Sequence, residues 1–591
     1  MSNYFSLFTD KGKKLNELLE FIYKDRAEEA KNILSIVISK RIPDLEKLKA
    51  ACDKPKKGIS AKDALLITYG DMISKMPGKA DSSGKPEAGR SALNKLSSFL
   101  DRYIPGLFSF IHILPFYPYS SDDGFSVMDY RLVDPVLGSW KDISLLGEKR
   151  KLVFDFVINH ASAKSSWFGS FKRQEKPYNK FFVTRPLDYD YSAVLRPRTH
   201  PLITPIQLDN GETLGVWTTF SEDQIDLNFS EPIVLAEFVD IMLFYALKGA
   251  RMFRLDAIAY LWKMDGTSCA HLPQTHAVVK LLRTILDNLG LDILLLTETN
   301  VPHKDNISYF GKADEAHIVY NFSLPPLVLY AFVTADPAPL AAWANQLKVP
   351  DNAIMLNFLA SHDGIGVTPV QGFIADYGPV LEGVKARGGL ISMKASKDGP
   401  MPYELNISWA DAVAPLNASS EEKAAALLAS YGIALAMDGL PAVYFHSLFG
   451  SENWAEGPGI LAYNRAINRQ KPEMSGLECS LKNPLSLRSM ALAGFTNLLK
   501  ERSRRNIFDP GKAAVKFWAD KHIFYAERAR ESQFILILVN CSNLPLKALI
   551  PEQYKNSPVF NPVTAKLCGM LQNNFIELAP FALLWLEKLI H

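Results

Sequence analysis

The chain has 591 residues, of which 48% are hydrophobic and 22% charged, and its formal net charge is +2. This length allows one large domain with smaller attachments, and the composition is that of an ordinary globular protein. A near-neutral charge without a basic stripe or a block of like charges argues against nucleic-acid binding and membrane-surface binding.

The amino terminus and the cysteines indicate in which cellular compartment the protein is expected. The segment MSNYFSLFTDKGKK has no basic region followed by an apolar core, so it does not predict a signal peptide. No apolar run is long enough to span a bilayer. The odd number and the spacing of the cysteines favour a reducing cytoplasm over a disulfide scaffold or a metal site. The cysteines are Cys52, Cys269, Cys479, Cys541 and Cys568.

The first predicted element is a helical extension at residues 1–60. An apolar face with helical spacing runs from Leu15 to Ile22, and Pro43 interrupts a second helical stretch. The segment CDKPKKGIS that follows is typical of a linker. The simplest interpretation is an arm that packs against the main domain.

Short apolar runs then alternate with amphipathic helices. Each run is apolar in its body and ends in polar or charged residues, as is typical of parallel strands that helices cover on both faces. The runs predict an α/β fold, a (β/α)8 TIM barrel with its active site at the carboxyl ends of the strands. Periodicity by itself is also compatible with one strand fewer or more. The runs are ALLITYG, FSFIHILPFYP, KLVFDFVINH, ARMFRLDAIAY, DILLLTETN, AHIVYNFS, AIMLNFLASHD and LPAVYFHSLFG.

Three segments depart from this alternation. Residues 161–230, rich in Pro, Tyr and Arg, predict a lobe inserted after the third strand, and residues 364–425 predict a second insertion after the seventh. Long insertions at the catalytic face of a barrel usually shape a binding site. Residues 512–591 predict a C-terminal antiparallel β domain. The barrel itself then comprises residues 61–160 and 231–511.

Three of the predicted strands end in carboxylates. Asp256 closes the fourth run, Glu298 the fifth and Asp363 the seventh, and the carboxyl ends of barrel strands converge on one rim. Such a concentration of charge is unfavourable unless function requires it. Arg254, two residues before Asp256, is the partner expected to keep that aspartate ionised. A single acidic residue at a strand end more often forms a cap or a loop salt bridge, but three on separate strands favour a catalytic site.

Glycoside chemistry with retention of configuration uses such a set. An ionised carboxylate attacks the anomeric carbon, and a second carboxyl group, about 5–5.5 Å away, protonates the leaving oxygen and then deprotonates the acceptor. A third carboxylate can hold sugar hydroxyls while the ring flattens. His160, at the end of the third strand, and His362 add hydrogen-bonding groups suited to those hydroxyls.

The motifs that carry these residues resemble, in order, the four conserved regions of the α-amylase family of glycoside hydrolases. The motifs are DFVINH, FRLDAIAY, LLLTETN and FLASHD. The resemblance implies that Asp256 is the nucleophile, Glu298 the acid/base and Asp363 the transition-state stabiliser. The residues that it places in the glucose subsite are Arg254, His160 and His362.

Within this family the chain is similar to the sucrose phosphorylase branch. The likeness rests on HILPFYPYSSDDGFSVMDYRLVDPVLGSW, RPRTHPLITP, GTSCAHL, SHDGIGV and YNRAINR. A pocket closed around one glucose suits a substrate with a single transferable glucosyl unit. The likeness implies that Asp122 and Arg465 lie at the glucose 4-hydroxyl and that Phe125 and Tyr260 form apolar walls. It also places Gln224 among the residues that bind substrate.

The helical extension, WTTFSEDQIDLN, TETNVPHKDNISYFG and PYELNIS are similar to the glucosylglycerate phosphorylases. Sucrose phosphorylases look shorter at the amino terminus and carry Gln where Glu404 stands. The resemblance implies a glycosyltransferase that converts 2-O-α-D-glucosylglycerate and phosphate to α-D-glucose 1-phosphate and D-glycerate. Sucrose phosphorylase, glucosylglycerol phosphorylase, a glycoside hydrolase and a non-catalytic amylase-like module are the alternatives.

A phosphorylase must favour phosphate over water, so its acceptor site should attract an anion and exclude solvent. In the inserted lobe, VLRPRTHPLITP supplies Arg196, Arg198 and His200, and the planar fork of arginine matches phosphate or carboxylate oxygens. Glycerate is also an anion, so one basic site could serve the leaving glycerate and the entering phosphate. The simpler explanation is that the arginines pair with lobe carboxylates such as Asp188 or Asp190.

The remaining expectations concern the second insertion, metals and partners. Tyr403 and Glu404 are expected at the acceptor site, with Glu404 accepting hydrogen bonds from acceptor hydroxyls, and Lys304 is a further candidate for anion binding. Asn159 stands where many amylases bind calcium, but the sucrose phosphorylase branch lacks that ion, so the resemblance implies no structural metal. We also expect no cofactor and no zinc site. The expected partners are a small glucoside, inorganic phosphate and glycerate, with the chain a monomer or a homodimer.

Overall fold

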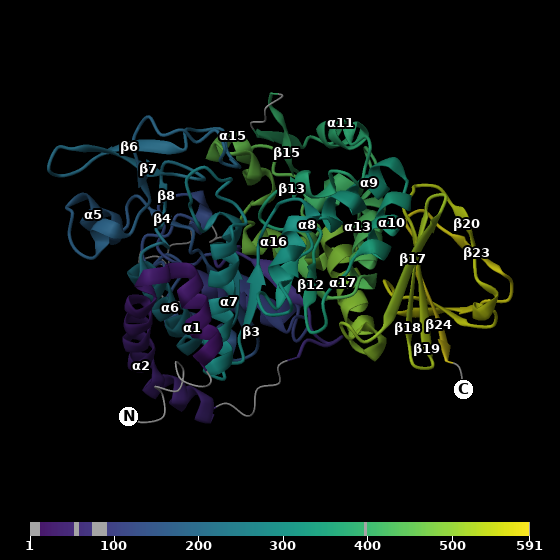
Figure 1. The fold of residues 1–591 in the computed structure, drawn as a ribbon. Coiled ribbons are helices and arrows are strands. Elements are labelled where there is room, and N and C mark those ends of the chain that lie inside the picture. The colour runs from purple at the N-terminus through teal and green to yellow at the C-terminus, as the bar shows by residue number, and fades with distance from the viewer. Residues whose placement is uncertain (1–11, 52–57, 74–90, 395–398, 590–591) are drawn as a thin grey trace, which may run out of the picture.

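The computed structural model describes residues 12–51, 58–73, 91–394 and 399–589. Its centre is a closed barrel of eight parallel strands (Figure 1). They are β1 (Leu65–Thr68), β2 (Phe110–Ile113), β3 (Lys151–Phe156), β9 (Ala250–Leu255), β10 (Leu294–Thr297), β11 (Ile318–Tyr320), β12 (Ile354–Asn357) and β16 (Leu440–Tyr444). Their order around the barrel is β1-β16-β12-β11-β10-β9-β3-β2. Each strand lies in one of the apolar runs, so the predicted TIM barrel is confirmed.

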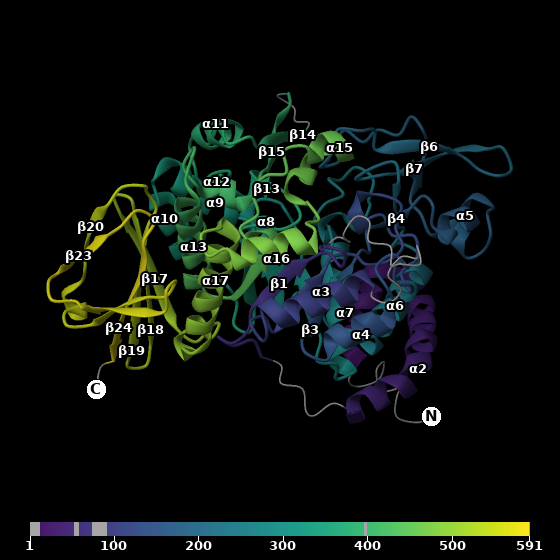
Figure 2. The same cartoon turned by 180° about the vertical axis from the view of Figure 1, so that it is seen from behind.

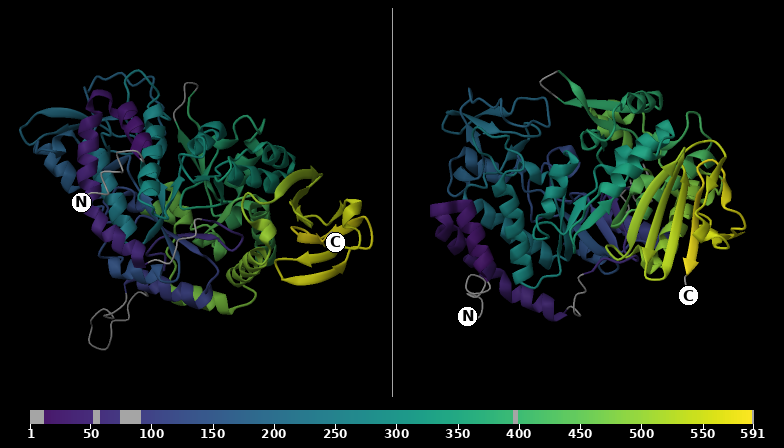
Figure 3. Two further views of the ribbon diagram at one scale, coloured as in Figure 1. Left: turned by 60° about the horizontal axis from the view of Figure 1, so that its bottom comes forward. Right: turned by 45° about the vertical axis from the view of Figure 1, so that its right-hand side comes forward.

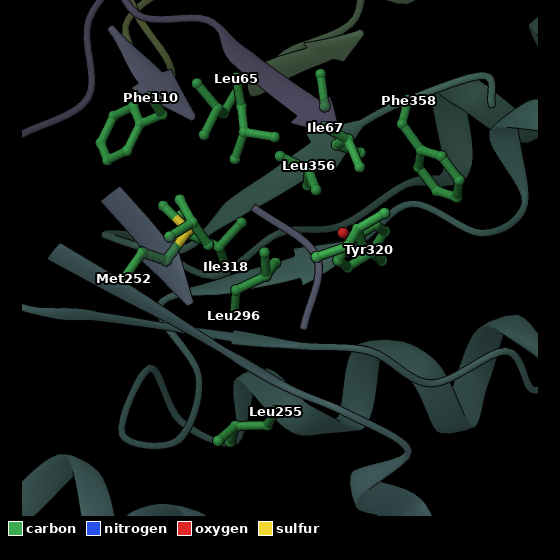
Figure 4. Packing of buried hydrophobic residues seen from close by; sticks show 14 of the residues in the cluster. Leu65, Ile67, Phe110, Met252, Leu255, Leu296, Ile318, Tyr320, Leu356 and Phe358 are labelled. Atoms are coloured by element: carbon green, nitrogen blue, oxygen red, sulfur yellow. The ribbon is translucent and has the colours of Figure 1, made fainter. Parts of the chain in front are cut away.

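Buried hydrophobic side chains fill the barrel (Figure 4). Ile67, Met252, Leu296 and Leu356, from four different strands, are fully buried. Burial of one such side chain stabilises the fold by about 1.5–3 kcal/mol. Because helices cover the outer face of each strand as well, both faces are apolar and the sequence shows unbroken apolar runs.

Helices surround the barrel (Figure 2). The first helical residues of α6 (Pro232–Leu247) include Pro232, and Gly249, with a φ of +99°, follows its end. None of the described helices combines the length and apolar character needed to cross a membrane. The other helices around the barrel are α3 (Ala92–Tyr103), α4 (Trp140–Gly147), α7 (Pro273–Asn288), α8 (His303–Ile307), α9 (Leu324–Thr334), α10 (Ala338–Gln346), α13 (Ser420–Ala436), α14 (Phe445–Leu448), α15 (Gly457–Leu461), α16 (Met474–Lys482) and α17 (Leu487–Ser503).

The chain between β3 and α6 forms short antiparallel strands and one α-helix. The strands are β4 (His160–Ser162), β5 (Thr184–Arg185), β6 (Ile203–Gln207), β7 (Thr213–Trp217) and β8 (Gln224–Asp226), and the helix is α5 (Ser166–Lys172). β4 pairs with β8, and the other three strands form a sheet in the order β5-β7-β6. Trp217 and Leu202 pack there against Cys269, which follows β9. Since β4 begins at His160, this lobe is joined directly to a strand end of the barrel.

The chain after β12 forms a small sheet of β13 (Ile365–Gly366), β14 (Leu390–Lys394) and β15 (Met401–Asn406) in the order β13-β15-β14. Two short helices accompany it, α11 (Gly378–Ala386) and α12 (Trp409–Val413). Helix α13 then begins before residue 425, the predicted end of this insertion, because Ser419 and Glu422 form a capping box at its start.

The N-terminal extension packs on the outer helices of the barrel (Figure 3). Its helix α1 (Lys13–Tyr23) lies against α7, and α2 (Ala27–Ala51) lies along α6. Arg41 donates to both carboxylate oxygens of Asp240 on α6, at 2.6 and 2.7 Å. Pro43 lies inside α2, so the expected interruption there is wrong. The predicted linker at residues 52–60 falls mostly outside the described residues.

The C-terminal region is an antiparallel β structure, as predicted. Its main sheet has the order β17-β18-β19-β24-β21-β22, and β20 pairs with β23 beside it. The side-chain amide of Asn345, on α10, donates to the carbonyl of Phe517 at 2.7 Å and fixes this region to the barrel. The strands are β17 (Ala514–Asp520), β18 (Ile523–Arg530), β19 (Gln533–Asn540), β20 (Leu546–Leu549), β21 (Pro558–Asn561), β22 (Lys566–Met570), β23 (Phe575–Leu578) and β24 (Leu583–Leu589).

Candidate active site

Two of the three carboxylates contact one guanidinium group. Asp256 directly follows β9 and Glu298 directly follows β10, and these strands are neighbours in the barrel. The guanidinium of Arg254, on β9, lies 2.8 Å from Asp256 Oδ1 and 3.7 Å from Glu298 Oε2. The two carboxylates therefore lie close together at the carboxyl end of the barrel.

The turn after β9 orients both groups. Ala257 has a left-handed backbone conformation, with φ +46° and ψ +32°. Its amide N–H donates to Glu298 Oε2 at 2.9 Å. This conformation costs a residue with a side chain about 1–3 kcal/mol, and it persists where the surrounding structure holds it in place. The backbone at the end of one strand thus positions the carboxylate at the end of the next.

A buried chain of polar groups supports Arg254. His112 Nε2 lies 2.8 Å from Asp155 Oδ2, and Arg254 Nη1 donates to Asp155 Oδ1 at 2.5 Å. All three side chains are at most 2% exposed, a depth that charged groups tolerate only with partners. Burial opposes ionisation of Asp155, but Arg254 and His112 outweigh it and hold its pKa below the ordinary value. The arginine in this apolar strand is therefore an internal counter-ion.

Burial is the largest influence on both paired carboxyl groups. It raises the pKa of Asp256 well above the ordinary value, with Glu298 and Asp363 adding to the rise and Arg254 opposing it. Burial and Asp363 likewise raise the pKa of Glu298 against Arg254. Arg254 favours the ionised form of Asp256, but its guanidinium is shared with Asp155 and does not outweigh burial, so it stays a prediction that Arg254 keeps Asp256 ionised. The pair holds a proton readily, as an acid catalyst requires.

Two arginines and a histidine lie around Asp363. Its Oδ1 lies 2.5 Å from Arg465 Nη1 and 3.7 Å from Arg469 Nη2, and its Oδ2 lies 3.3 Å from His362 Nε2. Burial opposes ionisation here too, but Arg465 and Arg469 outweigh it and hold the pKa of Asp363 below the ordinary value. The three carboxyl groups therefore differ in character, because the pKa of Asp363 is lowered while those of Asp256 and Glu298 are raised.

Aromatic and imidazole rings lie beside these carboxylates. Phe125 follows the short helix η4 (Asp122–Gly124) and stacks on His362, with ring centroids 4.9 Å apart and planes at 5°. The guanidinium carbon of Arg254 lies 5.4 Å from the centre of the Phe125 ring. His160 Nε2 lies 3.0 Å from the carbonyl oxygen of Phe125. Burial and Arg469 lower the pKa of His362 well below the ordinary value, so its imidazole is neutral.

Residues of the inserted lobe extend this group. Gln224 Nε2 lies 3.4 Å from Asp122 Oδ2 and 3.2 Å from His160 Nε2. Tyr260, in the short helix η6 (Ile258–Tyr260), makes an edge contact with Phe220, and Phe220 also contacts His160. The structure thus joins every residue predicted for the glucose subsite into one connected set of contacts. They are Asp122, Phe125, His160, Gln224, Arg254, Tyr260, His362 and Arg465.

Glu404 is held by Arg465. Arg465 Nε and Nη2 donate to the two Glu404 carboxylate oxygens at 2.9 and 2.8 Å, and the Gly364 N–H donates to Oε1 at 2.6 Å. The side chain is only 2% exposed. Both oxygens thus accept hydrogen bonds within the protein, and that Glu404 also accepts hydrogen bonds from acceptor hydroxyls stays a prediction. Its role in the structure is to fix Arg465 beside Asp363.

Arg198 lies where the inserted lobe meets the second insertion. Its guanidinium carbon is 5.7 Å from the ring centre of Phe220 and 5.7 Å from that of Tyr403 on β15. Arg198 also contributes to the lowered pKa of Asp363. The structure therefore brings Arg198 and Tyr403 together near the carboxylates, as a shared acceptor site requires.

Arg196 and His200 have partners inside the lobe instead. Arg196 Nη2 donates to the carbonyl oxygen of His200, and His200 Nε2 lies 2.9 Å from the carbonyl oxygen of Thr218. These contacts close the lobe loop on itself. Among the residues that the structure describes, neither Arg196 nor Arg198 forms an ion pair with Asp188 or Asp190, so the simpler explanation for these arginines is also wrong. Lys304, on α8, is exposed.

Comparison with known proteins shows to which family the chain belongs. The family model described as Alpha amylase, catalytic domain, matches residues 94–368. A glucosylglycerate phosphorylase from Spirochaeta thermophila is 43% identical over 555 residues, which cover 92% of this chain and 92% of that protein. The chain belongs to the glucosylglycerate phosphorylase family. The resemblance read from the motifs is therefore confirmed.

Two other relatives show how the family is related to its neighbours. A sucrose phosphorylase from Agrobacterium vitis is 31% identical over 457 residues, which cover 73% of this chain and 87% of that protein. The crystal structure of sucrose 6F-phosphate phosphorylase from Thermoanaerobacter thermosaccharolyticum aligns with a TM-score of 0.70 at 24% identity, over 82% of this chain and 95% of that one. At that identity the structural likeness shows the fold alone, and it agrees with the barrel described above.

In this member of the family a lysine lies beside Asn159. Lys263 Nζ is 2.5 Å from Asp226 Oδ2 and 3.0 Å from Asn159 Oδ1. The Lys263 and Asp226 side chains are 3% and 0% exposed, so the ammonium supplies the charge that a buried carboxylate needs. No group of three or more His, Cys, Asp or Glu side chains that could hold a metal is found in the described parts of the chain. That the protein needs no structural metal stays a prediction.

Sequence reasoning missed several residues of the site, among them Asp155, Phe220 and Lys394. Asp155 could have been found from the sequence. Like Arg254, it is a charged residue inside an apolar run, and such a residue needs a buried partner. Phe220 could not have been found in this way, since one aromatic residue in a lobe rich in aromatics is not distinctive. Lys394, at the end of β14, lies 5.7 Å from the ring centre of Tyr403. Its place depends on the pairing of β14 with β15, which no local pattern reveals.

Proposed function

We propose that this protein is a retaining phosphorylase that converts 2-O-α-D-glucosylglycerate and phosphate to α-D-glucose 1-phosphate and D-glycerate. The observation that carries the proposal is the contact of Asp256 and Glu298 with the single guanidinium of Arg254. Two carboxyl groups so placed can act on one anomeric carbon. Membership of the glucosylglycerate phosphorylase family supports glycerate as the acceptor.

In the first half-reaction, a carboxylate oxygen of Asp256 attacks C1 of the glucosyl unit. The bond between C1 and the glycerate oxygen breaks, and Glu298 gives its proton to that oxygen. D-Glycerate leaves, and an ester joins C1 to Asp256. The raised pKa of Glu298 supports this assignment because it favours the protonated form that an acid catalyst needs. Arg254 then stabilises the ionised form of Asp256 that attacks.

In the second half-reaction, a phosphate oxygen attacks C1 from the side that glycerate has left. The ester bond breaks and restores the Asp256 carboxylate, while Glu298 accepts the proton of the attacking phosphate. Two inversions at C1 give net retention. The enzyme returns to its starting protonation state, with the proton on Glu298.

Asp363 has the properties of a transition-state stabiliser. Its lowered pKa supports a permanent negative charge, which favours the positive charge that develops at C1 and the ring oxygen. Arg465 and Arg469 hold the carboxylate in place. Phe125 and the neutral His362 form one wall of the glucose subsite, with Asp122, His160, Gln224 and Tyr260 as further contacts for the sugar.

Arg198 supports the preference for phosphate over water. Its guanidinium presents paired donors that match phosphate or carboxylate oxygens. The rings of Phe220 and Tyr403 beside it reduce the space for solvent, which strengthens its attraction for an anion. We assign Arg198 and Tyr403 to the acceptor site.

The test is release of glucose 1-phosphate from a panel of glucosides. The expected result is phosphate-dependent turnover of 2-O-α-D-glucosylglycerate that exceeds turnover of sucrose and of glucosylglycerol. The identity with a sucrose phosphorylase makes sucrose the second candidate substrate. Release of free glucose at the same rate without phosphate would instead identify a hydrolase, and no turnover of any glucoside would contradict an enzymatic role.

We also infer a location in the cytoplasm, with the chain as a monomer or a homodimer. Cys269 and Cys541 are buried and unpaired, which suits a reducing compartment. Cell fractionation tests the location, and light scattering of the purified chain tests the oligomeric state.

A further inference from the structure

Lys394 brings a second positive charge to the Tyr403 ring, which Arg198 also contacts. Its Nζ lies 5.7 Å from the ring centre of Tyr403, and the guanidinium carbon of Arg198 lies 5.7 Å from the same centre. Lys394 Nζ also donates to Thr368 Oγ1 at 3.0 Å. One cation comes from the inserted lobe and the other from the second insertion. Two segments far apart in sequence thus bring their charges to one tyrosine.

Neither cation has a carboxylate partner among the residues that the structure describes. The contacts of Arg198 are the two aromatic rings and the carbonyl oxygen of Pro197, at 3.3 Å. Those of Lys394 are the Tyr403 ring and the Thr368 hydroxyl. The carboxylate of Glu404, next to Tyr403 on the same strand, is paired with Arg465 and accepts a hydrogen bond from the Gly364 N–H.

The environment of Lys394 is unfavourable for its charge as it stands. Burial lowers the pKa of Lys394, and among the residues that the structure describes no acidic neighbour offsets that effect. A second cation on the same ring adds repulsion. An anion bound between the two would relieve both costs, since each cation would gain a charge-assisted hydrogen bond.

We propose that Lys394 and Arg198 together bind the anionic group of the acceptor, which makes Lys394 a specificity-determining residue of the acceptor site. The anionic group is the carboxylate of glycerate or the phosphate that replaces it. This inference rests on the proposed function. A neutral acceptor such as glycerol gains nothing from the ammonium, so Lys394 favours charged acceptors over neutral ones.

The test compares the Lys394→Met variant with the wild type in both directions. In synthesis from glucose 1-phosphate, the ratio of kcat/KM for glycerate to that for glycerol should fall by about tenfold or more, since a charge-assisted hydrogen bond is lost. In phosphorolysis, the KM for phosphate reports the other anion. A rise in the KM for glycerate shows that the Lys394 ammonium binds the glycerate carboxylate, and a rise in the KM for phosphate shows that it binds phosphate. Either result supports the proposal. Lys394→Arg should retain most of the preference.

Two controls separate binding from folding. Lys385→Met, at an exposed position on α11 of the same insertion, should behave as the wild type. Hydrolysis of α-glucosyl fluoride uses no anionic acceptor, so Lys394→Met should lower it far less than it lowers the use of glycerate or phosphate. Unchanged kinetics with both anions, or an equal loss of fluoride hydrolysis, would overturn the inference. Failure of the proposed function is a different result, because the wild type would then release no glucose 1-phosphate from glucosylglycerate.

Discussion

Arg254 Nη1 donates to Asp155 Oδ1 at 2.5 Å and to Asp256 Oδ1 at 2.8 Å. A single buried nitrogen thus joins the carboxylate of one strand to the proposed nucleophile at the end of the next. Asp155 holds Arg254 in place, and its negative charge is among the causes that raise the pKa of Asp256. The reactivity of Asp256 therefore depends on Asp155, which acts on it through Arg254.

Asp155→Asn removes this charge with little change of shape. Breaking a buried ion pair costs about 3–5 kcal/mol, so urea unfolding should show a loss of that order. The acid limb of kcat/KM against pH should move to lower pH, because loss of a negative charge lowers the pKa of Asp256. Asp188→Asn, at an exposed lobe position, is the control. An acid limb that stays in place would show that Asp155 does not act on Asp256.

Asp256→Asn should abolish turnover. An amide cannot form the glucosyl ester, and removal of a nucleophile costs on the order of 10⁴-fold or more in kcat. Folding should remain intact, because the Asn oxygen can still accept the hydrogen bond from Arg254. Steady-state assays with glucosylglycerate measure the loss. A variant with near-normal rates would remove Asp256 from the mechanism.

The same variant tests the raised pKa of Asp256 through stability. A carboxyl group with a raised folded pKa favours the folded state when protonated, so its ionised form destabilises the fold as pH rises above the ordinary value of 3.8. Asn carries no such penalty. The Tm of Asp256→Asn relative to the wild type should therefore increase between about pH 4 and pH 8. A difference that falls over this range would contradict the direction of the shift.

Glu298→Gln should separate acid catalysis from the attack on C1. Turnover of glucosylglycerate should fall by about 10²–10⁴-fold, the usual contribution of a general acid. Transfer from α-glucosyl fluoride to the enzyme should persist, since fluoride leaves without a proton. In the wild type, the rate of glucosylglycerate cleavage should fall as pH rises through the raised pKa of Glu298, and this limb should be absent in the variant. Equal losses with both donors would argue against the acid role.

Arg198→Ala and Arg196→Ala form a matched pair. The first should raise the KM for phosphate by about tenfold or more while fluoride hydrolysis stays near normal, because a charged contact to the anion is lost. The second should leave that KM unchanged and lower stability by about 1 kcal/mol, since it removes a hydrogen bond within the lobe loop. Phosphate titrations and thermal unfolding measure the two effects. A raised KM for phosphate in Arg196→Ala, with an unchanged KM in Arg198→Ala, would place Arg196 in the acceptor site instead.

Lys263→Met should destabilise the protein strongly. It leaves the buried Asp226 carboxylate without its cation, a loss of about 3–5 kcal/mol in unfolding free energy. Lys304→Met, at an exposed position on α8, should change stability by less than about 0.5 kcal/mol. Dialysis of the wild type against EDTA should leave its Tm unchanged. A drop in Tm on chelation would show that a metal shares this site with Lys263.

The sequence by itself determined the barrel and the presence of three carboxylates at its strand ends. Each strand is buried on both faces, whichever strands it pairs with. Its sequence is therefore a continuous apolar run, which can be recognised without knowing its neighbours. The positions of Asp256, Glu298 and Asp363 at the ends of such runs are equally local. The closing of the barrel then follows from the number of runs and the helices between them.

Only the tertiary structure decided how the surrounding side chains are paired. Arg196 and Arg198 stand two residues apart in the same loop, yet one closes that loop and the other reaches Tyr403. Glu404 is an acceptor-site candidate by sequence and a partner of Arg465 in space. Lys394 has no distinguishing neighbours in the sequence at all. These outcomes depend on contacts between loops that are far apart along the chain, and the residue types of each loop are compatible with several such contacts.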